Sequence, residues 1–351
     1  MKFRYRRTFA CLAVSGALLW WHFGQPARPA VGAAMPATVQ ANAALARQVD
    51  ALAPNPDARR GLIASAHGSV RNAAGALVWD YNRFNFIGGA APPTVNPSLW
   101  RHAQLNNAPG LFKVSDGIYQ LRGFDLANLT LIEGKTGWIV VDPLTSEETA
   151  AAALAFARAH LGNRPVTAII FTHSHVDHFG GALGVVAPGA TLPVVAPAGF
   201  LDEASSENIL VGAAMGRRAS YQFGKLLPAS ANGVIDAGLG KGVALGKVGI
   251  LAPTISIGQN PQALLLDGVR FVFQNISGSE APAELAFFLP ERNAYCAAEL
   301  MTQSLHNLYT LRGAKVRDAL RWSGYIDEAL ARFGGADVVF ASHHWPVWGQ
   351  P

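Results

Sequence analysis

The segment His173-Ser174-His175-Val176-Asp177-His178 decides how the rest of this sequence is interpreted. It places three histidines and one aspartate within six positions, although the whole chain contains only ten histidines. In an extended or turning segment, His173 and His175 point to the same side and can share one metal ion. Asp177 and His178 follow the turn and can serve a second ion. Imidazole nitrogens and carboxylate oxygens suit Zn²⁺, with Fe or Mn as alternatives.

The residues around this segment predict an α/β fold. A buried strand over 166–171 leads directly into it, and an earlier strand over 137–142 ends in the carboxylate of Asp142. Between them, Thr145 and Glu148 form a capping box for an Ala-rich helix that stops near Gly162. In such folds, ligand residues gather at the carboxyl ends of strands. Further strands are predicted over 118–121, 129–132, 269–274, 285–289, 294–297 and 338–341.

Two metal ions need more protein ligands than this segment supplies. Glu280, Glu299 and His344 are candidates because each follows an apolar, strand-like run. A carboxylate at the end of a buried strand is costly unless it is paired or bound to a metal. The residues alone leave two alternatives open, Glu284 for Glu280 and His343 for His344.

Several longer motifs carry a resemblance to a known family. The H-x-H-x-D-H segment followed by Gly180-Gly181 resembles the metallo-β-lactamase superfamily, and within it the chain resembles the alkyl sulfatases from about residue 40 onward. The motifs are Asn128-Leu129-Thr130, Gly137 to Pro143, Tyr221 to Gly224, Gly238 to Gly242, Glu280 to Glu284, His306 to Gly313 and Ser342 to Pro346. The fold that this resemblance implies is the αββα sandwich of that superfamily, without the family's C-terminal domains.

The resemblance also implies two Zn²⁺ ions per chain. One would be held by His173, His175 and Glu280, and the other by Asp177, His178 and His344, with Glu299 bridging or lying between them. In most of the superfamily the position of Glu280 is a histidine, so the carboxylate favours the sulfatase branch.

The implied substrate is a sulfate ester. The family places sulfate recognition on the segment from Asn307 to Arg312, and a guanidinium can hold two sulfate oxygens at once. Asn307 and Thr310 add neutral donors, and Tyr221 is a weaker candidate for the substrate cleft. Asp177 and Arg312 are the residues expected to take part in catalysis.

The expected reaction is hydrolysis of fatty-alcohol sulfates, such as dodecyl sulfate, to alcohol and inorganic sulfate. A hydroxide held between the metals would be the nucleophile, because metal binding lowers the pKa of water towards about 7. The sequence leaves open whether carbon or sulfur is attacked, and which alkyl esters are preferred. Alternative functions are a lactam, thioester or phosphodiester hydrolase of the same superfamily, or a non-catalytic truncated fragment.

The N-terminus predicts export. A basic start, an apolar run from Phe9 to Trp21 and a small-residue stretch near Val31 to Ala34 form a signal peptide over 1–34. Arg6-Arg7 resembles a twin-arginine signal, so the expected location is periplasmic or secreted. Residues 35–110 are interpreted as a wrapping segment, and 111–351 as a catalytic domain that is incomplete at its C-terminus.

Charge and hydropathy limit the expected partners. The formal net charge is +5, but five basic residues precede Met35 without any acidic residue, and 23 basic residues then face 23 acidic ones. This balance gives no electrostatic footprint for nucleic acid. The apolar run of the signal is too short for a stable membrane anchor. Homodimerisation is typical of full-length alkyl sulfatases, and its expectation for this chain is weakened by the missing helical domain.

Overall fold

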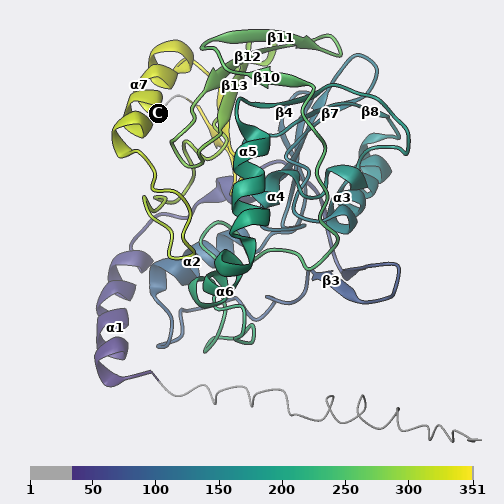
Figure 1. Cartoon of the computed structure of the whole chain (residues 1–351). Helices are drawn as coiled ribbons and strands as arrows, with labels where there is room; N and C mark the ends of the chain where they lie inside the picture. Colours follow the sequence, from purple (N-terminus) through teal and green to yellow (C-terminus); the bar gives the residue numbers. More distant parts are fainter. Residues whose placement is uncertain (1–33, 350–351) are drawn as a thin grey trace, which may run out of the picture. The chain divides into compact units, whose positions relative to one another are not determined.

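The computed structural model describes residues 34–349, so all but the last residue of the signal peptide predicted over 1–34 lies outside the described residues. Two sheets stack face to face, with helices on their outer faces (Figure 1). The first sheet has eight strands in the order β1-β4-β5-β6-β7-β8-β9-β10. They are β1 (Leu62–Ser65), β4 (Gly110–Ser115), β5 (Ile118–Arg122), β6 (Leu129–Glu133), β7 (Trp138–Val141), β8 (Val166–Ile170), β9 (Val194–Pro197) and β10 (Ile255–Ile257).

The second sheet has six strands in sequence order, β11 to β16. They are β11 (Gln262–Leu266), β12 (Val269–Asn275), β13 (Leu285–Leu289), β14 (Ala294–Cys296), β15 (Val338–Phe340) and β16 (Val347–Trp348). All eight strands predicted from the sequence are present within one or two residues of their expected bounds. A separate hairpin joins β2 (Ser69–Arg71) to β3 (Leu77–Asp80).

Helices complete the four layers. Helix α3 (Glu147–Leu161) buries Ala150, Ala153, Leu154 and Ala157 against the first sheet, the spacing of one helical face. Helix α7 (Ala319–Phe333) packs against the outer face of the second sheet. The other α-helices of the described residues are α1 (Pro36–Asp50), α2 (Pro97–Asn106), α4 (Val176–Phe179), α5 (Phe200–Ser205) and α6 (Gly212–Gln222). The predicted αββα sandwich is therefore confirmed.

The main core lies between the two sheets. Alternate residues of the first sheet, such as Ile139, Val141 and Ile170, meet the aromatic side chains of Phe273 and Phe287 from the second. Because side chains alternate between faces along a strand, the intervening residues face α3. Each sheet is thus buried on both faces at its centre, which explains the near-continuous apolar runs in the sequence.

Two sequence expectations need correction or refinement. The cap of α3 is Ser146, whose Oγ accepts from the backbone N–H of Thr149 at 3.1 Å, so the predicted Thr145–Glu148 capping box is wrong. Thr145 instead donates to the buried carboxylate of Asp125. In the segment interpreted as wrapping, β1 adds an edge strand to the first sheet by pairing with β4. Within residues 34–349, no helix is long and apolar enough to cross a bilayer.

The topology brings four strand ends to one place. Strands β7 and β8 run parallel in the first sheet, and β14 and β15 run parallel in the second. Their carboxyl ends carry Asp142, His173, Glu299 and His343 a few residues beyond the strands. An isolated bridge between His173 and Glu284 joins the two sheets at this edge.

Candidate metal centre

Four of the predicted ligands come together in one buried group. The ligand atoms of His173, His175, Glu280 and Glu299 all lie within 4.8 Å of one another. Each of these residues is at most 8% exposed. Two come from the loop after β8, and the two carboxylates come from loops after β12 and β14.

A second group contains Asp177, His178 and His343. Glu299 lies between the two groups. Its Oε1 is 3.2 Å from Nε2 of His173, 3.1 Å from Nε2 of His178 and 2.9 Å from Nε2 of His343. The intermediate position expected for Glu299 is therefore what the structure has.

The geometry selects His343, the alternative that the sequence left open, and corrects the expectation for His344. Nε2 of His344 lies 2.8 Å from the carbonyl oxygen of Gly238 and 3.0 Å from Nε2 of His102. Its Nδ1 accepts from the backbone N–H of Gln303. The backbone of His344 is left-handed, with φ of 65°, and its ring centroid lies 6.4 Å from that of His343. Burial, and then neighbouring His102, lowers the pKa of His344 to about 3, so the ring is neutral.

The donor set fits divalent metal ions. Three buried atoms of the two groups, Nε2 of His173, Nε2 of His178 and Oε2 of Glu280, have no hydrogen-bond partner. A buried polar atom left in this way costs about 1–3 kcal/mol unless a ligand satisfies it. The combination of imidazole nitrogen with carboxylate oxygen suits Zn²⁺ and related transition metals.

The outer nitrogens of the histidines are held by the protein, which directs the inner ones to the centre. Nδ1 of His178 lies 2.9 Å from Oδ2 of Asp142, and Nδ1 of His343 lies 3.1 Å from the carbonyl oxygen of Leu126. Burial raises the pKa of Asp142, but His178 and its hydrogen bond lower it more, so the carboxylate stays ionised. Burial likewise raises the pKa of Asp177, but the charge of His178 and the hydrogen bond to it contribute to a net lowering below the usual range.

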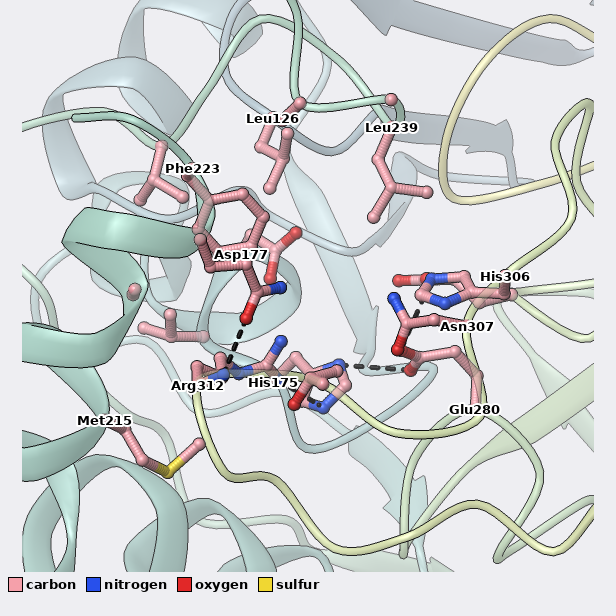
Figure 2. Close-up of a pocket in the computed structure, with 18 of the residues that line it drawn as sticks. Leu126, His175, Asp177, Met215, Phe223, Leu239, Glu280, His306, Asn307 and Arg312 are labelled. Carbon is pink, nitrogen blue, oxygen red and sulfur yellow. Dashed lines mark hydrogen bonds and ion pairs between the residues drawn. The ribbon is translucent and has the colours of Figure 1, made fainter. Parts of the chain in front are cut away.

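A cavity of about 530 Å³ opens onto both groups. Its polar part includes Asp177, Glu280, His306, Asn307 and Arg312 (Figure 2). Glu299 also lines it. Its apolar part includes Leu126, Met215, Phe223 and Leu239, and Figure 2 shows Leu126, Phe223 and Leu239 on one side of the cavity. The site therefore combines a metal-type donor set, a cationic side chain and an apolar wall.

This arrangement has a counterpart among known proteins. Residues 122–343, well over half of the chain, match the sequence model of the Metallo-beta-lactamase superfamily. The chain belongs to the metallo-β-lactamase superfamily.

Within the superfamily, the chain is similar to alkyl sulfatases. A linear primary-alkylsulfatase of a Pseudomonas species is 48% identical over 80% of this chain and 43% of its own length. An alkyl/aryl-sulfatase of Saccharomyces cerevisiae is 43% identical over 90% of this chain and 50% of its own. The structure of a stereoselective inverting sec-alkylsulfatase from Pseudomonas matches with a TM-score of 0.89 at 42% identity, covering 92% of this chain and 52% of that one.

These matches show similarity to alkyl sulfatases within the superfamily. The chain spans about half the length of the curated relatives that it matches.

The predicted substrate-binding residues differ in whether they line the cavity. Arg312, Asn307 and Thr310 all line the cavity. Nη2 of Arg312 lies 3.1 Å from Nε2 of His175, so the guanidinium adjoins the first group. Tyr221 is 85% exposed and does not line the cavity, so its expected place in the cleft is wrong. On α6 the cavity is reached by its neighbour Gln222 instead, whose Oε1 accepts from the backbone N–H of Arg312.

Several residues of the site carried no individual signal in the sequence. Nε2 of His306 lies 2.9 Å from Oε2 of Glu299. Arg317 is buried and forms an ion pair with Oε1 of Glu280. Glu207, from the π-helical turn Ser206–Leu210 after α5, has its Oε2 3.6 Å from both Nε2 of His175 and Nη2 of Arg312. Their spacing from the histidine segment follows no motif, because loops far apart in sequence bring them together.

Proposed function

We propose that this chain hydrolyses sulfate esters of alkyl alcohols, such as dodecyl sulfate, to the alcohol and inorganic sulfate. The observation that carries the proposal is the position of Arg312. Its guanidinium adjoins His175 in a cavity onto which the two buried groups of candidate metal ligands open. The similarity to alkyl sulfatases supports the same reaction class.

Arg312 and Asn307 would hold the sulfate group. A guanidinium presents parallel N–H donors that match two oxygens of a sulfate. Arg317 donates to Oδ1 of Asn307 at 2.7 Å, which fixes the amide and leaves its Nδ2 as the group to donate to a ligand. The hydroxyl oxygen of Thr310 accepts from the backbone N–H of Ala314, so we assign Thr310 to shaping the turn as well as lining the cavity.

The apolar part of the cavity would hold the alkyl chain. Leu126, Phe223 and Leu239 offer a surface without charge, on which an alkyl chain gains about 0.8 kcal/mol for each CH₂ removed from water. This wall favours a fatty-alcohol sulfate over a small hydrophilic ester.

We propose two Zn²⁺ ions as cofactors. His173, His175 and Glu280 would hold one ion, and Asp177, His178 and His343 the other, with Glu299 between them. Bound there, the ions would act as Lewis acids and would provide hydroxide from water at neutral pH.

The chain's own residues contribute charge stabilisation and orientation. Arg312 remains on the sulfate as negative charge develops there, and such a fixed donor typically contributes about 3–4 kcal/mol to the barrier difference. Glu207 lies 3.6 Å from Nη2 of Arg312 and limits where the guanidinium can point. Asp177 keeps its carboxylate ionised for the second group, which is the part of catalysis that we assign to it.

A substrate panel tests this proposal. The purified chain, loaded with Zn²⁺, is expected to release sulfate from dodecyl sulfate and to leave a lactam, a thioester and a phosphodiester unchanged. Turnover of one of those three without sulfate release would contradict the proposal. A folded, zinc-loaded chain inactive towards all four would support the reading as a non-catalytic fragment.

Isotope labelling then locates the bond that breaks. In ¹⁸O-water, label in the alcohol indicates attack on carbon, whereas label in the sulfate indicates attack on sulfur. Because the apolar lining of Leu126, Phe223 and Leu239 would remove more CH₂ groups of a longer chain from water, we expect higher activity on longer alkyl sulfates than on short ones, which a chain-length series measures directly.

Export is proposed as the setting of this activity. The basic and apolar N-terminal segment supports a periplasmic or secreted location. Fractionation of a bacterial host that expresses the whole chain is expected to recover it outside the cytoplasm, and retention in the cytoplasm after Arg6→Lys plus Arg7→Lys would identify the twin-arginine route.

A further inference from the structure

Glu284 is a buried carboxylate that belongs to neither ligand group. It is fully buried, and both of its oxygens accept hydrogen bonds from protein groups. Oε2 accepts from the backbone N–H groups of Glu280 and Ala281, each at 3.0 Å, and from Oγ of Ser279 at 2.8 Å. Oε1 accepts from the backbone N–H of Glu299 at 3.1 Å. These bonds occupy both oxygens.

Two of these donors are the backbone N–H groups of the candidate ligand residues Glu280 and Glu299. Glu280 and Glu299 lie in loops after β12 and β14, where no strand pairing fixes their backbones. The residue before Glu299, Ala298, has a left-handed backbone with φ of 49°. A single side chain therefore ties two irregular loops together at the positions from which the ligand carboxylates project.

The main chain of Glu284 extends this connection to the histidine segment. Glu284 forms the isolated antiparallel bridge with His173, and the backbone N–H of the next residue, Leu285, donates to the carbonyl oxygen of Thr172. One residue thus contacts all three segments that supply the first group. A shift of its carboxylate would move Glu280 and Glu299 relative to His173.

We infer that Glu284 is a positioning residue that fixes the backbones of Glu280 and Glu299 so that both carboxylates meet the metal ions. This inference rests on the metal site of the proposed function. It concerns the outer hydrogen bonds that orient ligands, and loss of such partners typically weakens metal binding 10- to 100-fold.

The test is the variant Glu284→Gln, which keeps the shape of the side chain. Glutamine has one acceptor oxygen in place of two, and its nitrogen can only donate, so it cannot serve the N–H groups on both sides. Zn²⁺ affinity of the metal-free protein is measured by competition with a chromophoric chelator. We expect about a 10- to 100-fold weaker affinity than in the parent chain.

A matched control separates positioning from general stability. Asp267 is another carboxylate with several protein donors: Thr136, Gly137 and Thr167 all donate to it. Thr167 lies near the start of β8, whereas His173 follows the end of the same strand. This network is therefore at the opposite end of the strand from the metal-type ligands. Asp267→Asn is expected to lower the Tm of the metal-free protein and to leave its Zn²⁺ affinity unchanged.

Two results would overturn the inference. One is a Zn²⁺ affinity of Glu284→Gln equal to that of the parent, and the other is an equal loss of affinity in Glu284→Gln and Asp267→Asn. Should Glu284→Gln not fold, Glu284→Asp withdraws the carboxylate by one methylene and is measured in the same way, with the same outcomes. A parent chain that binds Zn²⁺ but releases no sulfate would contradict the proposed function and leave this inference intact.

Discussion

At the scale of single residues, the centre depends on which ring nitrogen of each histidine faces inward. Asp142 holds the outer nitrogen of His178, and the Leu126 carbonyl holds that of His343, so their Nε2 atoms face Glu299. The neighbouring His344 has both nitrogens committed to backbone groups and His102. Adjacent histidines therefore have different tasks, and variants can distinguish them.

His343→Ala is expected to remove about one of two bound Zn²⁺ ions and to abolish activity, because a ligand of the second group is lost. His344→Ala is expected to keep both ions, since its ring contacts Gly238 and Gln303 and no member of the ligand groups. Metal content after dialysis, measured by atomic emission, gives the answer. Loss of zinc from His344→Ala with retention in His343→Ala would reverse the assignment.

Arg312→Ala is expected to lower kcat/KM for dodecyl sulfate about 100-fold, which corresponds to about 3 kcal/mol. Bound Zn²⁺ should be unchanged, because Arg312 borders the ligand group without belonging to it. Steady-state kinetics with a metal assay on the same sample checks both points. Arg217→Ala, an exposed arginine of α6 outside the cavity lining, is the control and should match the parent.

At the scale of elements, loops and turns carry the site while strands fix their ends. The strands were predictable because apolar runs and alternation are local features of the sequence. The predicted N-cap of α3 is one residue too early. Thr145 and Ser146 are both residue types that cap helices well, and the hydroxyl of Thr145 is instead hydrogen-bonded to Asp125. The turn after β11 shows how a carboxylate outside the site can join elements.

Asp267 links this turn to the starts of β7 and β8 through Thr136, Gly137 and Thr167. Partial burial raises its pKa, but these hydrogen bonds lower it more, so the pKa is below its ordinary value of 3.8 in the folded state. A lowered pKa stabilises the fold above that ordinary value, and the stabilisation disappears as pH falls through the folded pKa.

Asp267→Asn should therefore reduce the free energy of unfolding by about 1 kcal/mol at pH 7, and by less at pH 3.5. Urea unfolding of the metal-free proteins at both pH values measures this difference. A difference that is larger at pH 3.5 than at pH 7 would contradict the assignment of an ionised carboxylate in the folded state.

At the scale of the whole molecule, the ligand groups lie where the two sheets meet. Residues of β8 and β14 are held by the core between the sheets, and the loops that follow them converge on the same ligand groups. Metal binding should therefore stabilise the entire sandwich. The family relatives are about twice as long, so activity of this chain by itself is a separate measurement from its stability.

Removal of metal with EDTA is expected to lower Tm by about 5 to 10 °C. A ligand at 1,000 times its Kd adds about 4 kcal/mol, and in a protein of this size each kcal/mol shifts Tm by about 2 °C. Differential scanning calorimetry with and without Zn²⁺ tests this, and Mg²⁺ serves as the control ion that prefers all-oxygen sites. An unchanged Tm would argue against metal binding at these groups.

Local patterns in the sequence predict an α/β fold and the ligand cluster from His173 to His178, because apolar runs and closely spaced ligands can be recognised within a few residues. The αββα sandwich is implied by the resemblance to the metallo-β-lactamase superfamily, and the structure confirms it. The sequence also indicates Glu280, Glu299 and Arg312, which the structure brings to one cavity.

The choice between neighbouring candidates depends on the folded chain. His343 faces Glu299, whereas the ring of His344 contacts the backbones of Gly238 and Gln303. Glu280 joins the ligand group while Glu284 binds backbone N–H groups from two other loops. Tyr221 points outward because its helix presents Gln222 to the cavity instead. Each choice turns on side-chain direction across loops far apart in sequence, which no local pattern encodes.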